Sequence, residues 1–177
     1  MPVARLVPFT RRHVDALTDG FNSGAAAATT FWRMPVSYAR AAGRFELQGR
    51  LRPKPHRFAI LDAGRFVGLC ALFPATYSGR TLVIAIFDPK ARGKGIGTYA
   101  VQTLCDFGFR KLKTHRIELG VYTHNHRAIA VYEKCGFKRE ALLRRDVYND
   151  GVWQNSLWMS LLRDEWSARN VAPRAKT

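Results

Sequence analysis

Apolar residues recur along the chain at two intervals, and each interval predicts one type of element. Spacings of three and four residues predict amphipathic helices over residues 12–21, 36–51 and 98–113. A further short helix is expected after Asn125, whose side chain can cap it, and before Gly136, which can supply the left-handed residue that ends it. Helices are therefore expected in both halves of the chain.

Strands are predicted where apolar and polar residues alternate, or where a short β-branched run stands between turn residues. The segments 62–64 (Asp-Ala-Gly) and 149–151 (Asn-Asp-Gly) carry residues that tight hairpin turns favour. The strands expected on this basis are 57–61, 66–73, 81–87, 117–121, 137–148 and 152–161. Together with the helices, they predict a mixed α/β fold in which helices pack on a sheet.

The length and hydropathy of the chain indicate one domain. The 177 residues are 47% hydrophobic, which is enough for a single core. We expect this domain to cover residues 1–166, and we expect 167–177, with Pro173 and mixed charge, to be a disordered tail. The sequence shows neither an apolar run of about 18 residues nor a secretory leader, so a cytoplasmic protein is expected.

The charge of the chain is strongly positive, with 29 Lys and Arg against 13 Asp and Glu and a formal net charge of +16. Such a field attracts anions, so nucleic acid, an anionic membrane surface and a phosphorylated ligand such as coenzyme A all fit it. A solvated basic surface without a specific partner explains the same composition. Charge alone therefore does not choose a function.

Cysteine and histidine do not have the spacing of a metal site. Cys70, Cys105 and Cys135 stand in apolar surroundings and are expected to be buried thiols. His124 and His126 flank the expected helix cap, but no third ligand stands near them in the sequence. No metal is therefore expected.

The strongest chemical signal is a glycine-rich loop, RGKGIG, at residues 92–97. It follows the expected strand 81–87 and precedes an expected helix, and this order leaves backbone N–H groups and the positive helix end available to an anion. Glycine has no Cβ to keep a pyrophosphate away from those amides. The loop therefore predicts a phosphate-binding site.

Three alternatives exist for this loop. A Walker A site requires Ser or Thr after its lysine, whereas Gly95 follows Lys94. A dinucleotide fingerprint has the spacing GxGxxG, whereas this loop has GxGxG and follows a meander of strands. The third alternative is a glycine-rich turn that binds nothing, and the loop taken alone does not separate this from an anion site.

Two ordered motifs resemble those of the GNAT superfamily of acyl-CoA-dependent N-acyltransferases. Residues 92–97 match its R/QxxGxG/A coenzyme A motif, and residues 125–137 (NHRAIAVYEKCGF) are similar to its second motif. The resemblance covers 81–166, with a weaker match over 3–73, and includes the branch typified by the Rim ribosomal-protein N-terminal acetyltransferases. It implies a mostly antiparallel twisted sheet of about seven strands with a splayed parallel pair, flanked by about four helices.

The resemblance also implies roles for individual residues. Tyr132 matches the general acid of the family, and a phenol can donate a proton at neutral pH. Asn125 matches a position that helps to hold the coenzyme arm, and Arg127 is placed to reach its phosphates, although a helix cap and a solvated charge explain these two residues as well. The other coenzyme-binding residues expected are Ile86 and Phe87 at the strand end, and Arg92, Gly93, Lys94, Gly95, Ile96, Gly97 and Thr98 in the loop.

One feature of the family is missing. Many relatives carry a glutamate on the strand before the loop, whereas 81–87 has none. The other candidates for a general base are Glu46, Asp88, Glu118 and His124, each of which also fits a cap, a turn or a surface group. A water chain or a partly neutral substrate amine would serve equally well.

The sequence therefore predicts transfer of an acetyl or similar acyl group from acetyl-CoA to a primary amine, by direct attack in a ternary complex. The acceptor is expected to be a small molecule or a protein N-terminus, because the mean positive field disfavours polyamines and aminoglycosides. The aromatic cluster of Phe31, Trp32, Met34 and Tyr38 fits either an acceptor wall or plain core.

The alternative function is a non-catalytic module that binds RNA or the ribosome through its basic surface. The missing glutamate favours this alternative, whereas the intact loop and Tyr132 favour the enzyme. No membrane partner is expected, and the sequence leaves a homodimer open.

Overall fold

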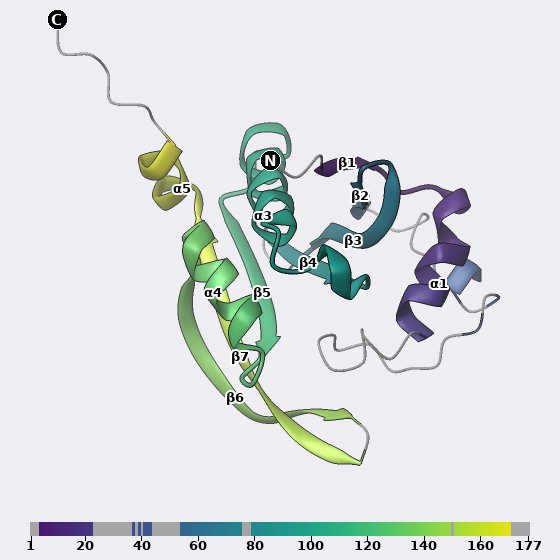
Figure 1. The fold of residues 1–177 in the computed structure, drawn as a ribbon. Coiled ribbons are helices and arrows are strands. Elements are labelled where there is room, and N and C mark those ends of the chain that lie inside the picture. Colours follow the sequence, from purple (N-terminus) through teal and green to yellow (C-terminus); the bar gives the residue numbers. More distant parts are fainter. Residues whose placement is uncertain are drawn as a thin grey trace, which may run out of the picture.

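The computed structural model describes residues 4–22, 37, 39, 41–43, 54–75, 79–149 and 151–170. In these residues a seven-stranded sheet has the order β1-β2-β3-β4-β5-β7-β6 (Figure 1). The strands are β1 (Ala4–Pro8), β2 (His56–Asp62), β3 (Arg65–Pro74), β4 (Arg80–Ile86), β5 (Arg116–Tyr122), β6 (Lys138–Asn149) and β7 (Val152–Leu162). Neighbouring strands are antiparallel except β4 and β5, which are parallel. The predicted sheet is confirmed.

Helices lie on both faces of the sheet. The described helical segments are η1 (Arg11–His13), α1 (Val14–Asn22), η3 (Pro89–Ala91), α3 (Ile96–Asp106), η4 (Phe107–Lys111), α4 (His126–Cys135) and α5 (Arg163–Asn170). One cluster of buried side chains joins α3 and α4 to one face of the sheet, and a second cluster joins α1 to the other face (Figure 1). The core therefore has two parts, separated by the sheet.

Local sequence explains several boundaries of these elements. In the turn between β2 and β3, Ala63 and Gly64 both have positive φ angles, of 49° and 82°, as a two-residue hairpin turn of type I′ requires. The Asn125 side chain accepts a hydrogen bond of 3.2 Å from the Ala128 amide, and Gly136 ends α4 with a φ of 103°. Both predicted caps of this helix are confirmed.

Other boundaries differ from the prediction. Strand β1 was not expected, and α5 continues to Asn170, so the prediction of a disordered tail is wrong for residues 167–170. Residues 171–177 lie outside the described chain. Of the helix expected over 36–51, the described residues 39 and 41–43 are helical.

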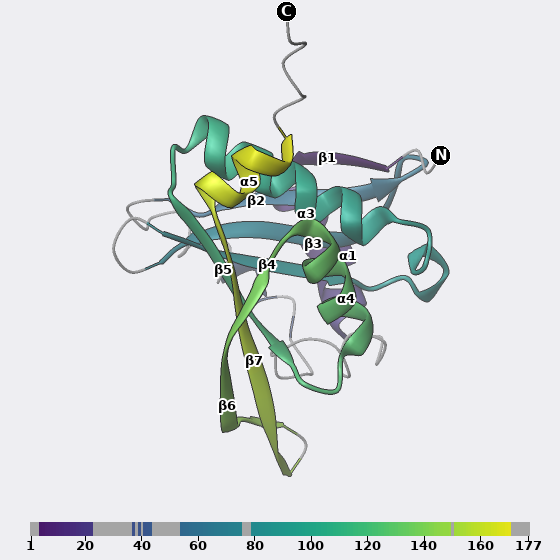
Figure 2. The ribbon, with the colours of Figure 1, turned by 90° about the vertical axis from the view of Figure 1, so that its left-hand side faces the viewer.

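The parallel strands β4 and β5 separate soon after they start. They pair only at Arg80↔Ile117 and Thr81↔Glu118 among the described residues, and Figure 2 shows them diverging beyond that point. On the other edge of β4, the Phe87 amide donates to the Val67 carbonyl over 2.9 Å. Along an antiparallel strand, the backbone groups of successive residues form hydrogen bonds on alternate sides. Ile86 therefore directs its N–H and C=O groups into the gap toward β5.

Expectations for the cysteines and for membrane-spanning segments also came from the sequence. Cys70, Cys105 and Cys135 are buried and free, as predicted. None of the helices in the described ranges is long and apolar enough to cross a membrane.

Candidate active site

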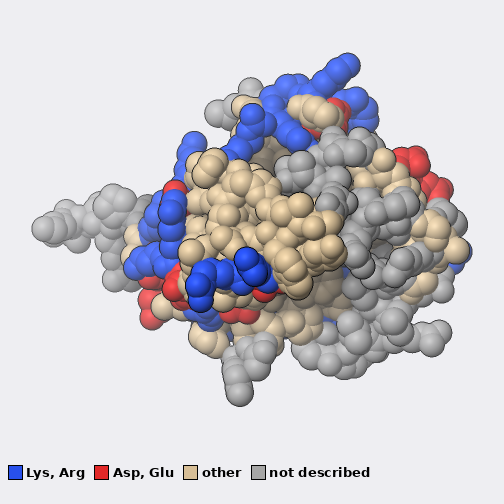
Figure 3. All heavy atoms as spheres, turned by 90° about the horizontal axis from the view of Figure 1, so that it is seen from below, with Lys and Arg blue, Asp and Glu red and all other residues tan. Residues whose placement is uncertain are grey.

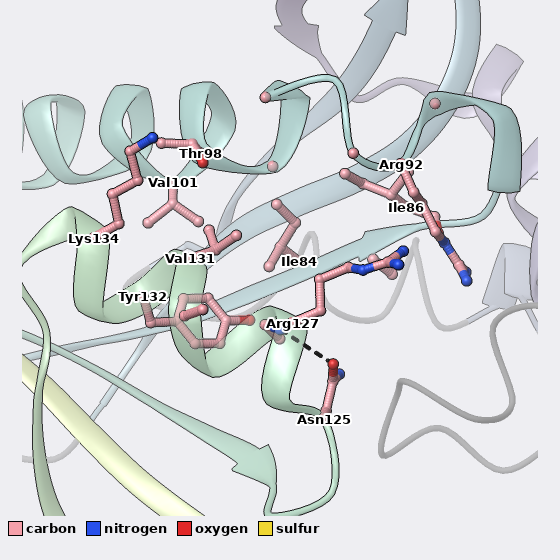
Figure 4. A pocket seen from close by; sticks show the side chains of 17 residues that line it. Ile84, Ile86, Arg92, Thr98, Val101, Asn125, Arg127, Val131, Tyr132 and Lys134 are labelled. Carbon is pink, nitrogen blue, oxygen red and sulfur yellow. Dashed lines mark hydrogen bonds between the residues drawn. The ribbon is translucent and has the colours of Figure 1, made fainter.

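A cavity of about 760 Å³ lies between β4 and α4 (Figure 4). Its walls come from β4, the glycine loop, the first turns of α3 and one side of α4. The predicted site residues among its lining are Ile86, Arg92, Gly93, Gly95, Gly97, Thr98, Asn125, Arg127 and Tyr132. The structure thus brings together two motifs that are about thirty residues apart in the sequence, in a volume typical of small-molecule sites.

The glycine loop takes a backbone conformation that favours glycine. Gly93 and Gly95 have φ angles of 78° and 80°, and Gly95 is the N-cap residue of α3. An added Cβ would meet no atom within 4 Å at either position, so the space above the loop is open to a ligand. The side chain of Lys94 is exposed and that of Ile96 is 1% exposed in the core, and neither lines the cavity. The predicted role of these two residues in the anion site therefore rests on their backbone amides.

Arg92 lies between the loop and the end of β4. Its Nη2 and Nε atoms donate to the Ile86 carbonyl over 3.0 and 3.3 Å. Burial lowers the pKa of Arg92, the Arg127 guanidinium lowers it further, and Asp88 opposes both effects. Two guanidinium groups thus repel each other at one wall of the cavity, and a bound phosphate would relieve this repulsion.

The prediction for Phe87 is wrong as far as its side chain and amide are concerned. The ring lies in the core cluster on the other face of the sheet, with its centroid 4.9 Å from that of Phe21. The amide is already bonded to Val67. Of the two residues at this strand end, only Ile86 faces the cavity, because β-strand side chains and backbone groups both alternate along the strand.

Helix α4 presents a mixed face to the cavity. Arg127, Val131 and Lys134 occupy positions i, i+4 and i+7 of this helix, and all three line the cavity. Figure 4 shows Lys134 extending toward α3. The sequence analysis did not single out Lys134, although its helical spacing from Arg127 was the signal that could have found it.

Tyr132 combines burial with access to the cavity. The residue is 7% exposed, and its ring packs against Phe137 with centroids 5.9 Å apart. Burial raises the pKa of Tyr132, and the nearby Cys135 thiol adds to the effect. The phenol is therefore neutral at physiological pH and carries a proton that it can donate.

The candidates for a general base are held in other interactions. Asp88 accepts from the Lys90 amide over 2.8 Å and pairs with Arg65 at 2.8 Å. Glu118 pairs with Arg116 at 3.0 Å, across from the last paired position of β4. Asp88 therefore fits the alternative of a turn residue, and Glu118 fits the alternative of a surface group.

The other residues that the sequence offered as a general base or an acceptor wall are surface groups or lie outside the described chain. The His124 ring stacks on Tyr122 at 5.1 Å, which fits a surface group. Glu46 and the cluster Phe31, Trp32, Met34 and Tyr38 lie outside the described residues. In the part of the chain that is described, His, Cys, Asp and Glu form no group of three that could hold a metal ion.

Comparison with known proteins connects this cavity to a family. Residues 4–138 match the sequence model described as "Acetyltransferase (GNAT) domain". The chain is 37% identical over 125 residues to the "Probable N-acetyltransferase YjcK" of Bacillus subtilis, an alignment that covers 68% of this chain and 69% of that protein. It is 30% identical over 108 residues to the "Putative ribosomal N-acetyltransferase YdaF" of the same organism, covering 60% and 59%.

The fold has a close counterpart among solved structures. The spermidine N-acetyltransferase from Vibrio cholerae, solved in complex with CoA and spermine, superimposes with a TM-score of 0.83. The match covers 92% of this chain and 97% of that one, at 23% sequence identity.

Proposed function

The chain belongs to the GNAT acetyltransferase family and is an acyl-CoA-dependent N-acetyltransferase, and we propose that it acetylates a primary amine by direct attack, with Tyr132 as the general acid. The glycine loop, the end of β4 at Ile86 and the buried Tyr132 phenol all bound one cavity, and this is the observation that carries the proposal. The match of residues 4–138 to the family model confirms the family that the two motifs predicted. Family membership also favours the enzyme over the non-catalytic RNA-binding alternative.

The described residues fit coenzyme A. The positive φ angles of Gly93 and Gly95 and the open space above them leave room for a pyrophosphate against the amides of residues 92–98. Arg92 and Arg127 supply the positive charge at the same wall. We assign the edge of β4 at Ile86 to the pantetheine arm, and the Asn125 amide group to a supporting contact with that arm.

The chemistry that remains for the protein is modest. Acetyl-CoA supplies an already activated thioester, so the chain must hold the amine in attacking geometry and support the departing sulfur. Backbone N–H groups on the gap side of β4 can donate to the developing oxyanion. The neutral Tyr132 phenol can donate its proton, or a strong hydrogen bond, to the thiolate. In the described residues Asp88 and Glu118 are engaged elsewhere, which favours water or the substrate's own neutral fraction as the base.

The acceptor is proposed to be a neutral or acidic small amine or a protein N-terminus. The solved counterpart binds spermine, which makes polyamines the competing class. A net charge of +16 lowers the local concentration of a polycation, whereas a neutral or anionic amine pays no such penalty. We also propose a cytoplasmic location, which the three free thiols support.

A screen for free-thiol release tests this function. Purified protein is incubated with acetyl-CoA and a panel that contains spermidine, neutral amines, acidic amines and peptides with free N-termini. We expect release of free CoA with one class of amine, and release slowed in Tyr132→Phe. Binding of acetyl-CoA without release for any amine would contradict the proposed transfer, and preference for spermidine would contradict the proposed acceptor class.

A further inference from the structure

The Ile86 carbonyl is a hydrogen-bond acceptor at a position where the coenzyme arm is proposed to bind. It points into the gap between β4 and β5, because the neighbouring Phe87 amide is bonded to Val67 on the opposite edge of β4. An extended ligand lying in the gap would meet this carbonyl as a sheet neighbour would. Ile86 also lines the cavity through its side chain.

In the structure this acceptor is already engaged by Arg92. The guanidinium donates two hydrogen bonds to it, from Nη2 at 3.0 Å and from Nε at 3.3 Å. A charged donor in this position is stronger than an amide N–H would be, so a neutral ligand alone is a poor competitor for the carbonyl. The arm of the coenzyme would therefore find one end of its strand partner blocked.

The same guanidinium belongs to the first residue of the phosphate loop. Arg92 immediately precedes Gly93, and it lies near enough to Arg127 for the two charges to repel. A phosphate bound at the loop is a better partner for a guanidinium than a neutral carbonyl is, since both members of that pair are charged. Figure 4 shows Arg92 and Arg127 directed toward the same end of the cavity.

We infer that Arg92 is a positioning residue that couples the two halves of coenzyme binding: phosphate at the loop draws its guanidinium away from the Ile86 carbonyl and thereby frees the edge of β4 for the pantetheine arm. The inference rests on the proposed coenzyme site. Its consequence is an order of events, in which the nucleotide end of the coenzyme prepares the site for the thioester end. Each half should then bind more tightly when the other half is present.

The first test observes the carbonyl directly. Ile86-Phe87 is the only Ile-Phe dipeptide in the chain, so ¹³C-carbonyl isoleucine combined with ¹⁵N-phenylalanine gives a single carbonyl–amide NMR signal. Saturation with 3′-phospho-ADP should move the carbonyl resonance upfield as the hydrogen bonds from Arg92 are lost, and added pantetheine should move it back. In Arg92→Met the signal should start at the upfield position and move little with nucleotide. A wild-type signal that does not move with bound nucleotide would overturn the inference.

The second test measures the coupling by calorimetry. In the wild type, pantetheine should bind about tenfold more tightly in the presence of saturating 3′-phospho-ADP than alone, since the two hydrogen bonds from the Arg92 guanidinium must otherwise be displaced. In Arg92→Met this ratio should fall close to one, because pantetheine alone already binds well. Arg127→Met is the matched control: it should weaken nucleotide binding and keep the tenfold ratio.

The outcomes separate the inference from the function on which it rests. If neither acetyl-CoA nor 3′-phospho-ADP binds the wild type, the proposed coenzyme site is wrong. If both bind and the ratio for pantetheine is one in the wild type, or if the tenfold ratio persists in folded Arg92→Met, the coupling through Arg92 is wrong and the coenzyme site stands. The wild-type ratio requires no variant, so a folding defect in Arg92→Met does not decide the matter.

Discussion

At the scale of single residues, the burial of Tyr132 has two opposing effects on catalysis. Burial raises the pKa of Tyr132, which keeps the phenol protonated across the physiological range. The same shift makes complete proton loss to a thiolate less favourable, because a thiol is the stronger acid. Tyr132 is therefore best suited to a donor that supports the departing sulfur with a hydrogen bond as its charge develops.

Removing this donor should affect turnover and not binding. We expect Tyr132→Phe to lower kcat about 10²-fold, the lower end of the range for general acids, because the hydroxyl is lost and the packing against Phe137 is kept. The dissociation constant for acetyl-CoA should change by less than about twofold. Thiol-release kinetics and calorimetry measure the two quantities. Unchanged kcat in a folded variant would remove Tyr132 from the mechanism.

The sequence predicted the role of an individual residue correctly where that role depends on the local backbone conformation. Glycines at 93 and 95 and the cap at Asn125 follow from local geometry, and the structure shows them as expected. The direction of Phe87 depends on which edge of β4 pairs with β3, and Lys134 reaches the cavity only because α4 packs opposite α3. Both orientations depend on tertiary packing, so the sequence motifs alone could not predict them.

At the scale of elements, the site depends on the junction of β4, the loop and α3. Gly95 caps α3 in the left-handed region with a φ of 80°, and the N-terminal amides of the helix follow it. An L-residue in this conformation costs about 1–2 kcal/mol, and a carboxylate in addition would occupy the position of the ligand's own charge.

A substitution at this junction should separate strain from charge. We expect Gly95→Glu to weaken acetyl-CoA binding at least about 100-fold, because a like charge fills the anion site. The matched control is Gly151→Glu in the β6–β7 turn, which has the same φ of 80° and nothing within 4 Å of an added Cβ. The control should lose comparable stability and keep its affinity. Retained affinity in a folded Gly95→Glu protein would refute the assignment of the loop.

Elements were predicted well where short-range signals specify them. The β2–β3 turn and both ends of α4 follow from residues at the turn or cap itself. Strand β1 has five residues and no strong alternation, and its pairing with β2 defines it. Helix α5 is held by contacts with other elements, such as the packing of Trp166 on Phe109 at 5.4 Å, which a reading of its own residues cannot show.

A network of hydrogen bonds and ion pairs across β5, β6 and β7 makes the stability of the fold depend on pH. The guanidinium of Arg116, which donates to Glu140 over 2.9 Å, lowers the pKa of Glu140 to about 2, and Ser160 assists. The ordinary value is about 4.3, so the folded state gains stability from this carboxylate above that pH and loses it as the pH falls toward 2.

Glu140→Gln should therefore lower the thermal midpoint at neutral pH only. The side chain is 42% exposed, so screening reduces the contribution to about 1 kcal/mol, or about 2–4 °C in Tm at pH 7. The difference from the wild type should disappear near pH 2. Glu133→Gln, which breaks an exposed pair with Arg139, is the control and should shift Tm little at either pH. An equal Tm deficit for Glu140→Gln at both pH values would contradict this account.

At the scale of the whole molecule, the excess of Lys and Arg over Asp and Glu gives the protein a positive field. Figure 3 shows Lys and Arg side chains gathered along two sides of one face, around a broad area of uncharged side chains. A field of this kind increases the local concentration of a polyanion such as acetyl-CoA and speeds its approach. It also explains why composition alone left nucleic acid and coenzyme A equally open, since both carry phosphates.

The contribution of this field should appear in the salt dependence of binding. Between 50 and 500 mM NaCl we expect the affinity for acetyl-CoA to fall about tenfold, because the Debye length shortens and phosphate contacts are screened. Pantetheine, which has no phosphate, is the matched ligand and should show almost no salt dependence. Salt-independent binding of acetyl-CoA, measured by calorimetry, would mean that the basic surface has no part in coenzyme capture.

The most direct test of the whole account is a crystal structure of the protein with acetyl-CoA. We predict density for the pyrophosphate against the amides of residues 92–98, for the arm along β4 at Ile86, and for the thioester sulfur within hydrogen-bonding distance of the Tyr132 hydroxyl. Acetyl-CoA bound elsewhere, with the cavity between β4 and α4 empty at saturating ligand, would contradict it.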